Sequence, residues 1–223
     1  MASDPALCVC GLAAEAGIAR RAGFAAIVGG GNAERTASRL AAAMSGARCL
    51  ISFGIAGGLD PDLRPGRLVL SGEVVAEDGQ WRADDALHGR IAAWSRELSA
   101  ATGKVLGGRQ IIATAEDKAR AWAETGAVAV DLESAITARA ASAAGIPFLV
   151  LRAIADGAPR DLPAAALIPL GCDGKPAIGR VLASLATRPH QLPSLIDLAR
   201  ATRAALAALT VGAAILHRLL ERG

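Results

Sequence analysis

The strongest constraint on the fold is an alternation of short apolar runs with helical patterns over the first 157 residues. The runs typical of strands cover residues 7–11, 25–28, 49–53, 68–75, 109–113, 127–132 and 148–154. The helical patterns between them cover residues 14–22, 33–45, 85–102, 115–124 and 134–144. Such an order predicts a three-layer α/β/α fold with a central mixed, largely parallel sheet.

The alternation stops after Asp156. Residues 158–176 are rich in proline, alanine and leucine, and helical patterns follow at 178–186 and from Pro193 onward. Proline is favoured in the first turn of a helix, where its missing N–H has no partner to lose. We therefore expect one domain, with an α/β core over residues 1–157 and a helical extension over residues 158–223 packed on it.

Composition excludes several classes of protein. Hydrophobic residues make up 52% of the chain and charged residues 20%, which excludes a disordered chain. A net charge of +3 and a near absence of aromatic residues argue against nucleic-acid binding. The four cysteines lack metal-site spacing, which indicates buried thiols in the cytoplasm and no bound metal. We expect no leader sequence, and the apolar stretch 204–216 is too short to span a bilayer.

Chemistry-bearing residues recur where the predicted strands end. They are Gly11 with Glu15, the glycine-rich run 54–58, the acidic run 131–133, and the run 152–156. In an open α/β sheet, ligands bind at the edge formed by the carboxyl ends of the strands. These four segments therefore predict a binding cleft at that edge.

Each of these residues has a structural alternative. Asp156 follows an apolar strand, so partial desolvation would keep it protonated as an acid, unless it only caps a helix. Glu133 could accept hydrogen bonds from substrate hydroxyls, or merely favour the first turn of a helix. The glycines at 54–58 could bring backbone N–H groups to an oxyanion or a sugar, or form a tight turn. For Arg152 we favour a structural ion pair with one of the carboxylates.

Four runs resemble the purine nucleoside phosphorylase/nucleosidase superfamily. They are SFGIAGGLDP at 52–61, RPGRLVLS at 64–71, VDLESA at 130–135 and VLRAIAD at 150–156. The C-terminal series RDLPAA from Arg160, DGKP from Asp173 and RPHQLPSL from Arg188 is similar to the hopanoid-associated phosphorylase subgroup. The resemblance covers nearly the whole chain.

The resemblance implies an enzyme that cleaves an N-glycosidic bond and releases adenine, with adenosylhopane as the substrate of the subgroup. Asp156 would protonate the purine and Glu133 would hold the ribose hydroxyls. Glu15 would be the base for attacking water, with phosphate held by arginines as the alternative nucleophile. The remaining substrate contacts implied are Leu132, Gly54, Ile55, Ala56 and Gly57. No other cofactor is implied.

Departures from the family pattern leave alternatives open. Ile55 replaces a hydroxyl residue, which weakens the case for a phosphate site, and Leu132 replaces methionine. The aromatic residue that stacks on the base is missing, and both Trp122 and Phe53 suit the core better. The alternatives are a methylthioadenosine/adenosylhomocysteine-type nucleosidase and a non-catalytic nucleotide-binding protein.

The expected partners are a small nucleoside and a second copy of the chain in a homodimer. The resemblance to the hopanoid-associated subgroup implies that this nucleoside is linked to a lipid. The apolar segment 192–220 packs on the sheet or forms an interface between copies. Alternatively, with residues 158–176 it forms an apolar mouth at the surface of the inner membrane, where arginines contact anionic lipid.

Overall fold

The computed structural model describes residues 5–168, 171, 173–175, 184 and 187–222. The strands are β1 (Ala6–Cys10), β2 (Ala25–Val28), β3 (Cys49–Gly58), β4 (Leu68–Ser71), β5 (Glu73–Ala76), β6 (Gly79–Arg82), β7 (Val105–Gly107), β8 (Ala129–Asp131) and β9 (Phe148–Asp156). The helices are α1 (Ala13–Arg21), α2 (Ala33–Ala43), α3 (Asp85–Glu97), α4 (Ala115–Thr125), α5 (Ser134–Ala144) and α7 (Leu192–Glu221), with 3₁₀ turns at Ala164–Leu167 and Pro189–Gln191.

The nine strands found in the described residues belong to one sheet. The β1–β2, β1–β3, β3–β9, β5–β7 and β7–β8 pairs are parallel, whereas β3–β8, β4–β9 and β5–β6 are antiparallel. The prediction of a mixed, largely parallel sheet is confirmed. Strand β3 is central, because its first half lies between β1 and β9 and its last two residues pair with β8.

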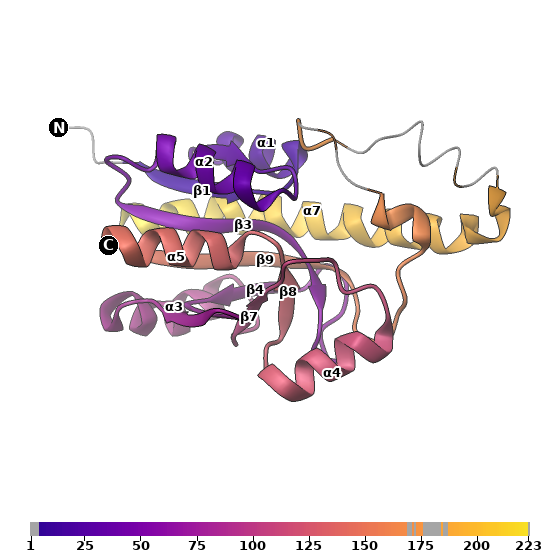
Figure 1. Cartoon of the computed structure of the whole chain (residues 1–223). Coiled ribbons are helices and arrows are strands. Elements are labelled where there is room, and N and C mark those ends of the chain that lie inside the picture. Colours follow the sequence, from indigo (N-terminus) through magenta and orange to yellow (C-terminus); the bar gives the residue numbers. More distant parts are fainter. Residues whose placement is uncertain (1–4, 169–170, 172, 176–183, 185–186, 223) are drawn as a thin grey trace.

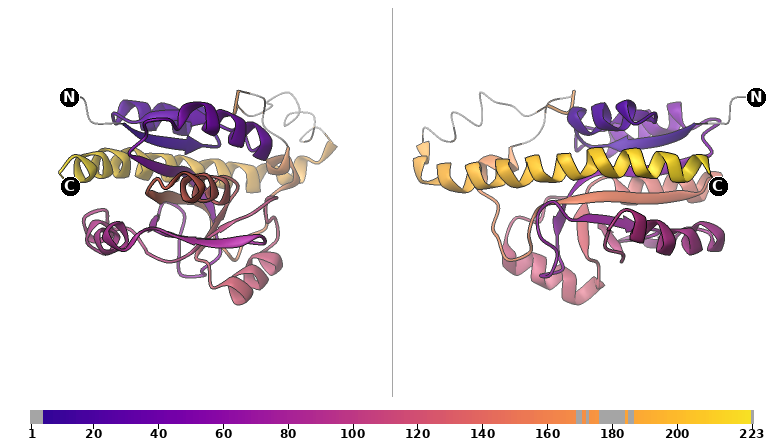
Figure 2. Two further views of the ribbon diagram at one scale, coloured as in Figure 1. Left: turned by 60° about the vertical axis from the view of Figure 1, so that its left-hand side comes forward. Right: turned by 180° about the vertical axis from the view of Figure 1, so that it is seen from behind.

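Helices cover both faces of this sheet, as Figures 1 and 2 show. One face packs α1, α3 and α7 around a core that includes Phe53, Leu70 and Leu209. The other face packs α2 and α5 around Leu50, Val150 and Ala138. Strands β1, β4 and β9 are buried on both faces, which explains why their sequences are continuous apolar runs rather than alternating ones.

Three local predictions were wrong. Residues 109–113 form no strand, and β7 comes earlier, at Val105–Gly107. The glycine run 54–58 continues strand β3, because pairing with β9 and β8 overrides the low strand propensity of glycine. Residues 68–75 form two strands separated at Gly72, where a β-carbon would lie 2.7 Å from Ile91 Cδ1 of α3.

The C-terminal helix α7 confirms the helix expected from Pro193 onward, whereas the pattern at 178–186 lies almost wholly outside the described residues. By length and composition alone, α7 could cross a membrane. However, its second half lies against the sheet and buries Ala205, Leu209 and Leu216. Its N-terminal end extends past the strands (Figure 2), and Leu192 and Ile196 are exposed there.

Candidate active site

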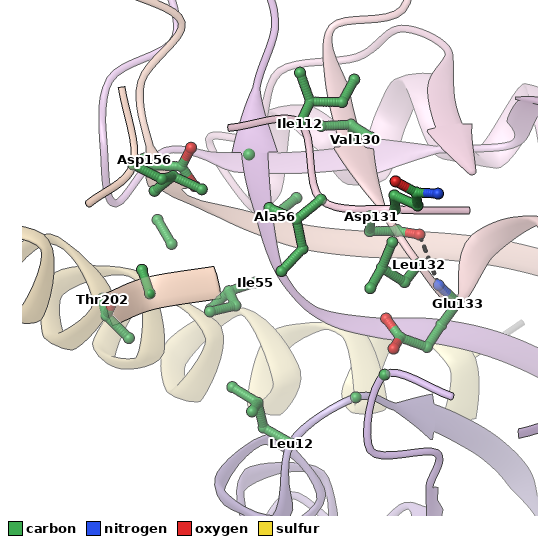
Figure 3. A pocket seen from close by; sticks show the side chains of 18 of the residues that line it. Leu12, Ile55, Ala56, Ile112, Val130, Asp131, Leu132, Glu133, Asp156 and Thr202 are labelled. Carbon is green, nitrogen blue, oxygen red and sulfur yellow. Dashed lines mark hydrogen bonds between the residues drawn. The ribbon is translucent and has the colours of Figure 1, made fainter. Parts of the chain in front are cut away.

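A cavity of about 330 Å³ opens where β1, β3, β8 and β9 end. Figure 3 shows Asp156 and Glu133 at its opposite ends, with Ile55, Ala56 and Val130 between them. Glu15 and Asp131 line it as well. The four segments predicted to meet at one edge of the sheet therefore do meet there.

Glu15 is held by backbone N–H groups from two segments. It lies in the first turn of α1 and is buried. Its Oε2 accepts hydrogen bonds from Gly11 N (3.0 Å) and Leu12 N (2.8 Å), and its Oε1 accepts one from Ile55 N (2.8 Å). Burial raises the pKa of Glu15, while the charge of Arg152 and the three N–H groups oppose that rise.

Two glycines make room for these carboxylates. A β-carbon at Gly54 would lie 2.5 Å from the Glu15 carboxyl carbon and 2.6 Å from Arg152 Nη1. A β-carbon at Gly11 would lie 2.7 Å from Glu133 Oε1. Any side chain at either position would therefore displace an acidic group of the site.

Arg152 is the central cation of the site. Its Nε lies 2.6 Å from Asp131 Oδ2, and its Nη2 donates to Glu133 Oε2 (3.4 Å) and to Ser52 Oγ (2.6 Å). Ser134 Oγ in turn donates to Ser52 Oγ (2.9 Å). The structural ion pair expected for Arg152 is therefore present, and Asp131, to which the sequence assigned no role, is its main partner.

Glu133 lies between β8 and α5, beside this cation. Burial raises the pKa of Glu133 to about 7, opposed by Arg152 and assisted by the negative charges of Asp131 and Glu15. Near neutral pH the carboxyl can therefore lose or hold a proton at little cost. A group of this kind suits hydrogen bonding to sugar hydroxyls, which both donate and accept.

Asp156 ends β9 and is 14% exposed in the cavity. A register shift between Ala56 and Gly57 places it opposite Gly57 of β3. Burial raises the pKa of Asp156 in the direction predicted from the sequence, and the nearby Lys118 ammonium lowers it. Lys118 was missed by the sequence reasoning, because a lysine in a charged helical stretch carries no signal of burial.

The structure corrects some of the remaining candidates. Leu132, Ile55, Ala56 and Gly57 line the cavity, but Gly54 lies behind Glu15 and does not. Phe53 is fully buried and Trp122 is exposed, and neither lines the cavity. Branched aliphatic side chains such as Ile112 and Val130 form the walls instead.

No cation lines the cavity in the part of the chain that the structure describes. A phosphate would have to be held by arginines near Glu15 in the sequence, and three of these are engaged at the end of β2. Arg20 and Arg35 donate to the carbonyls of Ala26 (2.8 Å) and Gly29 (3.4 Å), and Arg39 donates to that of Val28. Among the described residues, no group of three or more histidine, cysteine or acidic side chains could hold a metal ion.

Comparison with known proteins identifies the class. Residues 3–168 match the family model of the phosphorylase superfamily, and the chain belongs to that family. A 5′-methylthioadenosine/S-adenosylhomocysteine nucleosidase of Treponema pallidum is 30% identical over 155 residues. That match covers 51% of this chain and 58% of the relative, so the chain spans little more than half of the length of that curated protein.

Solved structures show the same fold. A 5′-methylthioadenosine/S-adenosylhomocysteine nucleosidase of Helicobacter pylori has a TM-score of 0.61 at 16% identity, covering 95% of this chain and 98% of that one. A futalosine hydrolase of the same organism has a TM-score of 0.60 at 16% identity, covering 94% and 97%. The predicted superfamily and fold class are confirmed, and the nucleosidase names of these relatives agree with the predicted class of enzyme.

Proposed function

We infer that this protein is a nucleosidase that hydrolyses the N-glycosidic bond of an adenine nucleoside bearing an apolar 5′ substituent. The observation that carries the inference is the pair of partly desolvated carboxyl groups, Glu15 and Asp156, on one cavity with Glu133. Cleavage of this bond leaves positive charge on the ribose and negative charge on the purine. The reaction therefore needs an acid that protonates the purine and a general base that activates the nucleophile.

Water is favoured over phosphate as the nucleophile. The N–H groups of Gly11, Leu12 and Ile55 already donate to Glu15, and the N–H of Ala13 donates to Gly174 O (3.2 Å). An anion at the start of α1 would find these donors occupied and a carboxylate in its place. Glu15, by contrast, can accept a proton from water.

The reaction then needs two proton transfers. Glu15 takes a proton from water as the water oxygen bonds to C1′ of the ribose. The C1′–N9 bond breaks, its electron pair goes to the purine, and N7 takes the proton of Asp156. Glu133 accepts hydrogen bonds from the ribose hydroxyls and favours the positive sugar. The products are the free base and the ribose with its substituent.

The apolar 5′ substituent is inferred from the cavity walls. Leu162, Ala166 and Ile168 come from the segment after β9, and Leu198 comes from α7. Leu167 in the same segment, and Leu192 and Ile196 at the start of α7, are exposed apolar side chains. A hydrocarbon tail would bury this surface and gain roughly 25 cal/mol per Å². Together with the C-terminal resemblance, this supports adenosylhopane as the substrate.

The same segment supports a cytoplasmic enzyme at the membrane surface. Arg160 and Arg200 are exposed beside this end of α7, and Asp197 pairs with both (3.5 Å each). Arginines around an apolar patch favour anionic lipid. Flotation with anionic vesicles at low salt checks this, since a protein that stays entirely in the soluble fraction has no membrane contact of this kind.

Product analysis tests the reaction. We expect adenine release from adenosylhopane without phosphate, with free ribosylhopane identified by mass. Glu15→Gln should abolish it, because the amide cannot take the proton of water. A ribose 1-phosphate product that forms only with phosphate would exclude hydrolysis.

A panel of nucleosides tests whether the substrate carries a lipid-linked 5′ substituent. Faster turnover of 5′-methylthioadenosine than of the lipid-linked nucleoside would instead favour the type of activity named for the Treponema pallidum relative. Release of no base from any nucleoside would indicate a non-catalytic binding protein. Replacement of Leu192 and Ile196 by serine should slow only the lipid-linked substrate.

A further inference from the structure

Lys118 is a fully buried cation directly against Asp156. Its side chain is 0% exposed, and its Nζ lies 2.5 Å from Asp156 Oδ2. The same nitrogen donates to Gly157 O (3.2 Å) and Arg160 O (2.8 Å). An ammonium group has three N–H donors, and here each has an acceptor. The surroundings are therefore built for the charged form of the lysine.

Burying the charge of Lys118 costs desolvation free energy, which would be unnecessary if Lys118 served only to anchor α4 to the core. Lys118 is the only buried residue of α4, a helix that the structure describes completely. An apolar side chain would attach this helix to the core without the desolvation cost of a buried charge. The ammonium group must therefore matter for what it contacts, which is Asp156 and the loop that follows it.

We propose that Lys118 is a positioning residue for base release: its ammonium group fixes the Asp156 carboxyl and sets the pH at which that carboxyl can donate its proton. The inference rests on the proposed function, in which Asp156 protonates the purine. Because Lys118 engages Oδ2, Oδ1 is the oxygen that would give its proton to the base. As Asp156 gives up its proton, the carboxylate that forms is paired at once with a fixed cation.

The direction of the electrostatic effect follows from the two opposing influences on Asp156. Burial alone would raise its pKa and make it a weak acid, whereas Lys118 lowers the pKa. A stronger acid transfers its proton to the purine more readily. Removing the ammonium group should therefore raise the pKa of Asp156 and slow proton transfer.

Other charged groups near this pair are engaged elsewhere. Asp161 accepts a hydrogen bond from Ala115 N (2.7 Å) at the start of α4. Other groups on the surrounding elements lie in exposed ion pairs or at the far side of the cavity: Glu116 and Asp117 with Arg120, Asp197 with Arg160 and Arg200, and Glu15, Asp131 and Glu133 with Arg152. Glu124, near the end of α4, is exposed to solvent. Lys118 is therefore the cation that acts directly on Asp156.

The test is the pH profile of kcat/KM, which reports the free enzyme, for Lys118→Met, with Lys104→Met as the matched control outside the site. In the wild type, the alkaline limb of the profile reports Asp156, and the acidic limb reports Glu15 and Glu133, which both act as carboxylates. In Lys118→Met we expect a lower maximum and an alkaline limb moved up by about 1–3 pH units, the size of effect that a neighbouring cation has on a carboxyl. The acidic limb should stay in place, and Lys104→Met should match the wild type.

Two outcomes would overturn the proposal. A uniform loss of rate with an unmoved alkaline limb would make Lys118 a purely structural residue. A limb moved to lower pH would make Lys118 itself the proton source. If the wild type releases no purine base at all, the proposed function fails rather than this inference.

A second measurement does not depend on the variant folding. In wild-type protein labelled with ¹³C at aspartate and ¹⁵N at lysine, NMR follows both groups, with Asp156→Asn assigning the carboxyl signal. We expect the Asp156 carboxyl to titrate at the pH of the alkaline limb, and its signal to respond to the neighbouring Lys118 ammonium. A carboxyl that titrates away from the alkaline limb would contradict the assignment of that limb to Asp156.

Discussion

Arg152 Nε lies 2.6 Å from Asp131 Oδ2, and the two side chains are 1% and 2% exposed. The N–H of Nε is not aligned for a hydrogen bond to that oxygen, so the contact is mainly electrostatic. Arg152 thereby carries the only positive charge among three buried carboxylates of the described site, at residues 15, 131 and 133. The geometry of the acidic groups depends on this one guanidinium.

Arg152→Met should be strongly destabilising, because it leaves Asp131 and Glu133 buried without a cation. Breaking a buried ion pair on one side typically costs about 3–5 kcal/mol. Urea unfolding followed by circular dichroism measures the loss. Arg120→Met is the matched control: its exposed pairs with Glu116 and Asp117 should contribute less than about 1 kcal/mol. Equal losses for both variants would contradict the central role of Arg152.

Asp156→Asn should lose most of the turnover while keeping the fold. General acid catalysis contributes about 10²–10⁴-fold, and an amide cannot protonate the purine. The measurement is kcat for adenine release, with unfolding curves as the control for structure. Near-normal release by a folded Asp156→Asn protein would exclude Asp156 as the proton donor.

Glu133 should make stability fall with rising pH. Its pKa is about 7 in the folded chain against an ordinary value of 4.5, so the folded state binds the proton more tightly than the unfolded state. The stabilisation from this proton is fully present below pH 4.5 and is lost as pH rises through 7. The free energy of unfolding of the wild type relative to Glu133→Gln should therefore decrease between those values. A difference that does not vary with pH would show that Glu133 titrates normally.

Two glycine-to-alanine changes should differ in effect: one should raise the stability of the protein, and the other should lower its activity. Gly89 lies exposed in α3 with no atom within 4 Å of an added β-carbon. Gly89→Ala should therefore stabilise the protein by about 0.5–1 kcal/mol, the helical advantage of alanine over glycine. Gly11→Ala should lower kcat, because its β-carbon would displace the Glu133 carboxylate. Thermal unfolding and adenine release check the pair, and full activity of Gly11→Ala would contradict the observed packing.

The sequence by itself determined the α/β alternation, most of the strands and helices, and the edge at which the site forms. Runs such as 148–154 are apolar throughout because parallel strands are buried on both faces, and this signal is local. Helix starts were equally local: Asn32 Oδ1 accepts from Arg35 N, and Thr114 Oγ1 accepts from Asp117 N. The acidic residues at the strand ends, Glu133 and Asp156, could be found for the same reason.

Only the tertiary structure decided which charges meet. Arg152 and Asp131 are 21 positions apart in the chain, and Lys118 and Asp156 are 38 positions apart. No local pattern encodes such pairs, because each depends on how separate elements pack. The same holds for the glycine run, which extends β3 because β8 and β9 supply hydrogen-bond partners. The sequence does not distinguish a buried lysine from an exposed one. The burial of Lys118 is shown only by its contacts with the surrounding carbonyls and the Asp156 carboxyl.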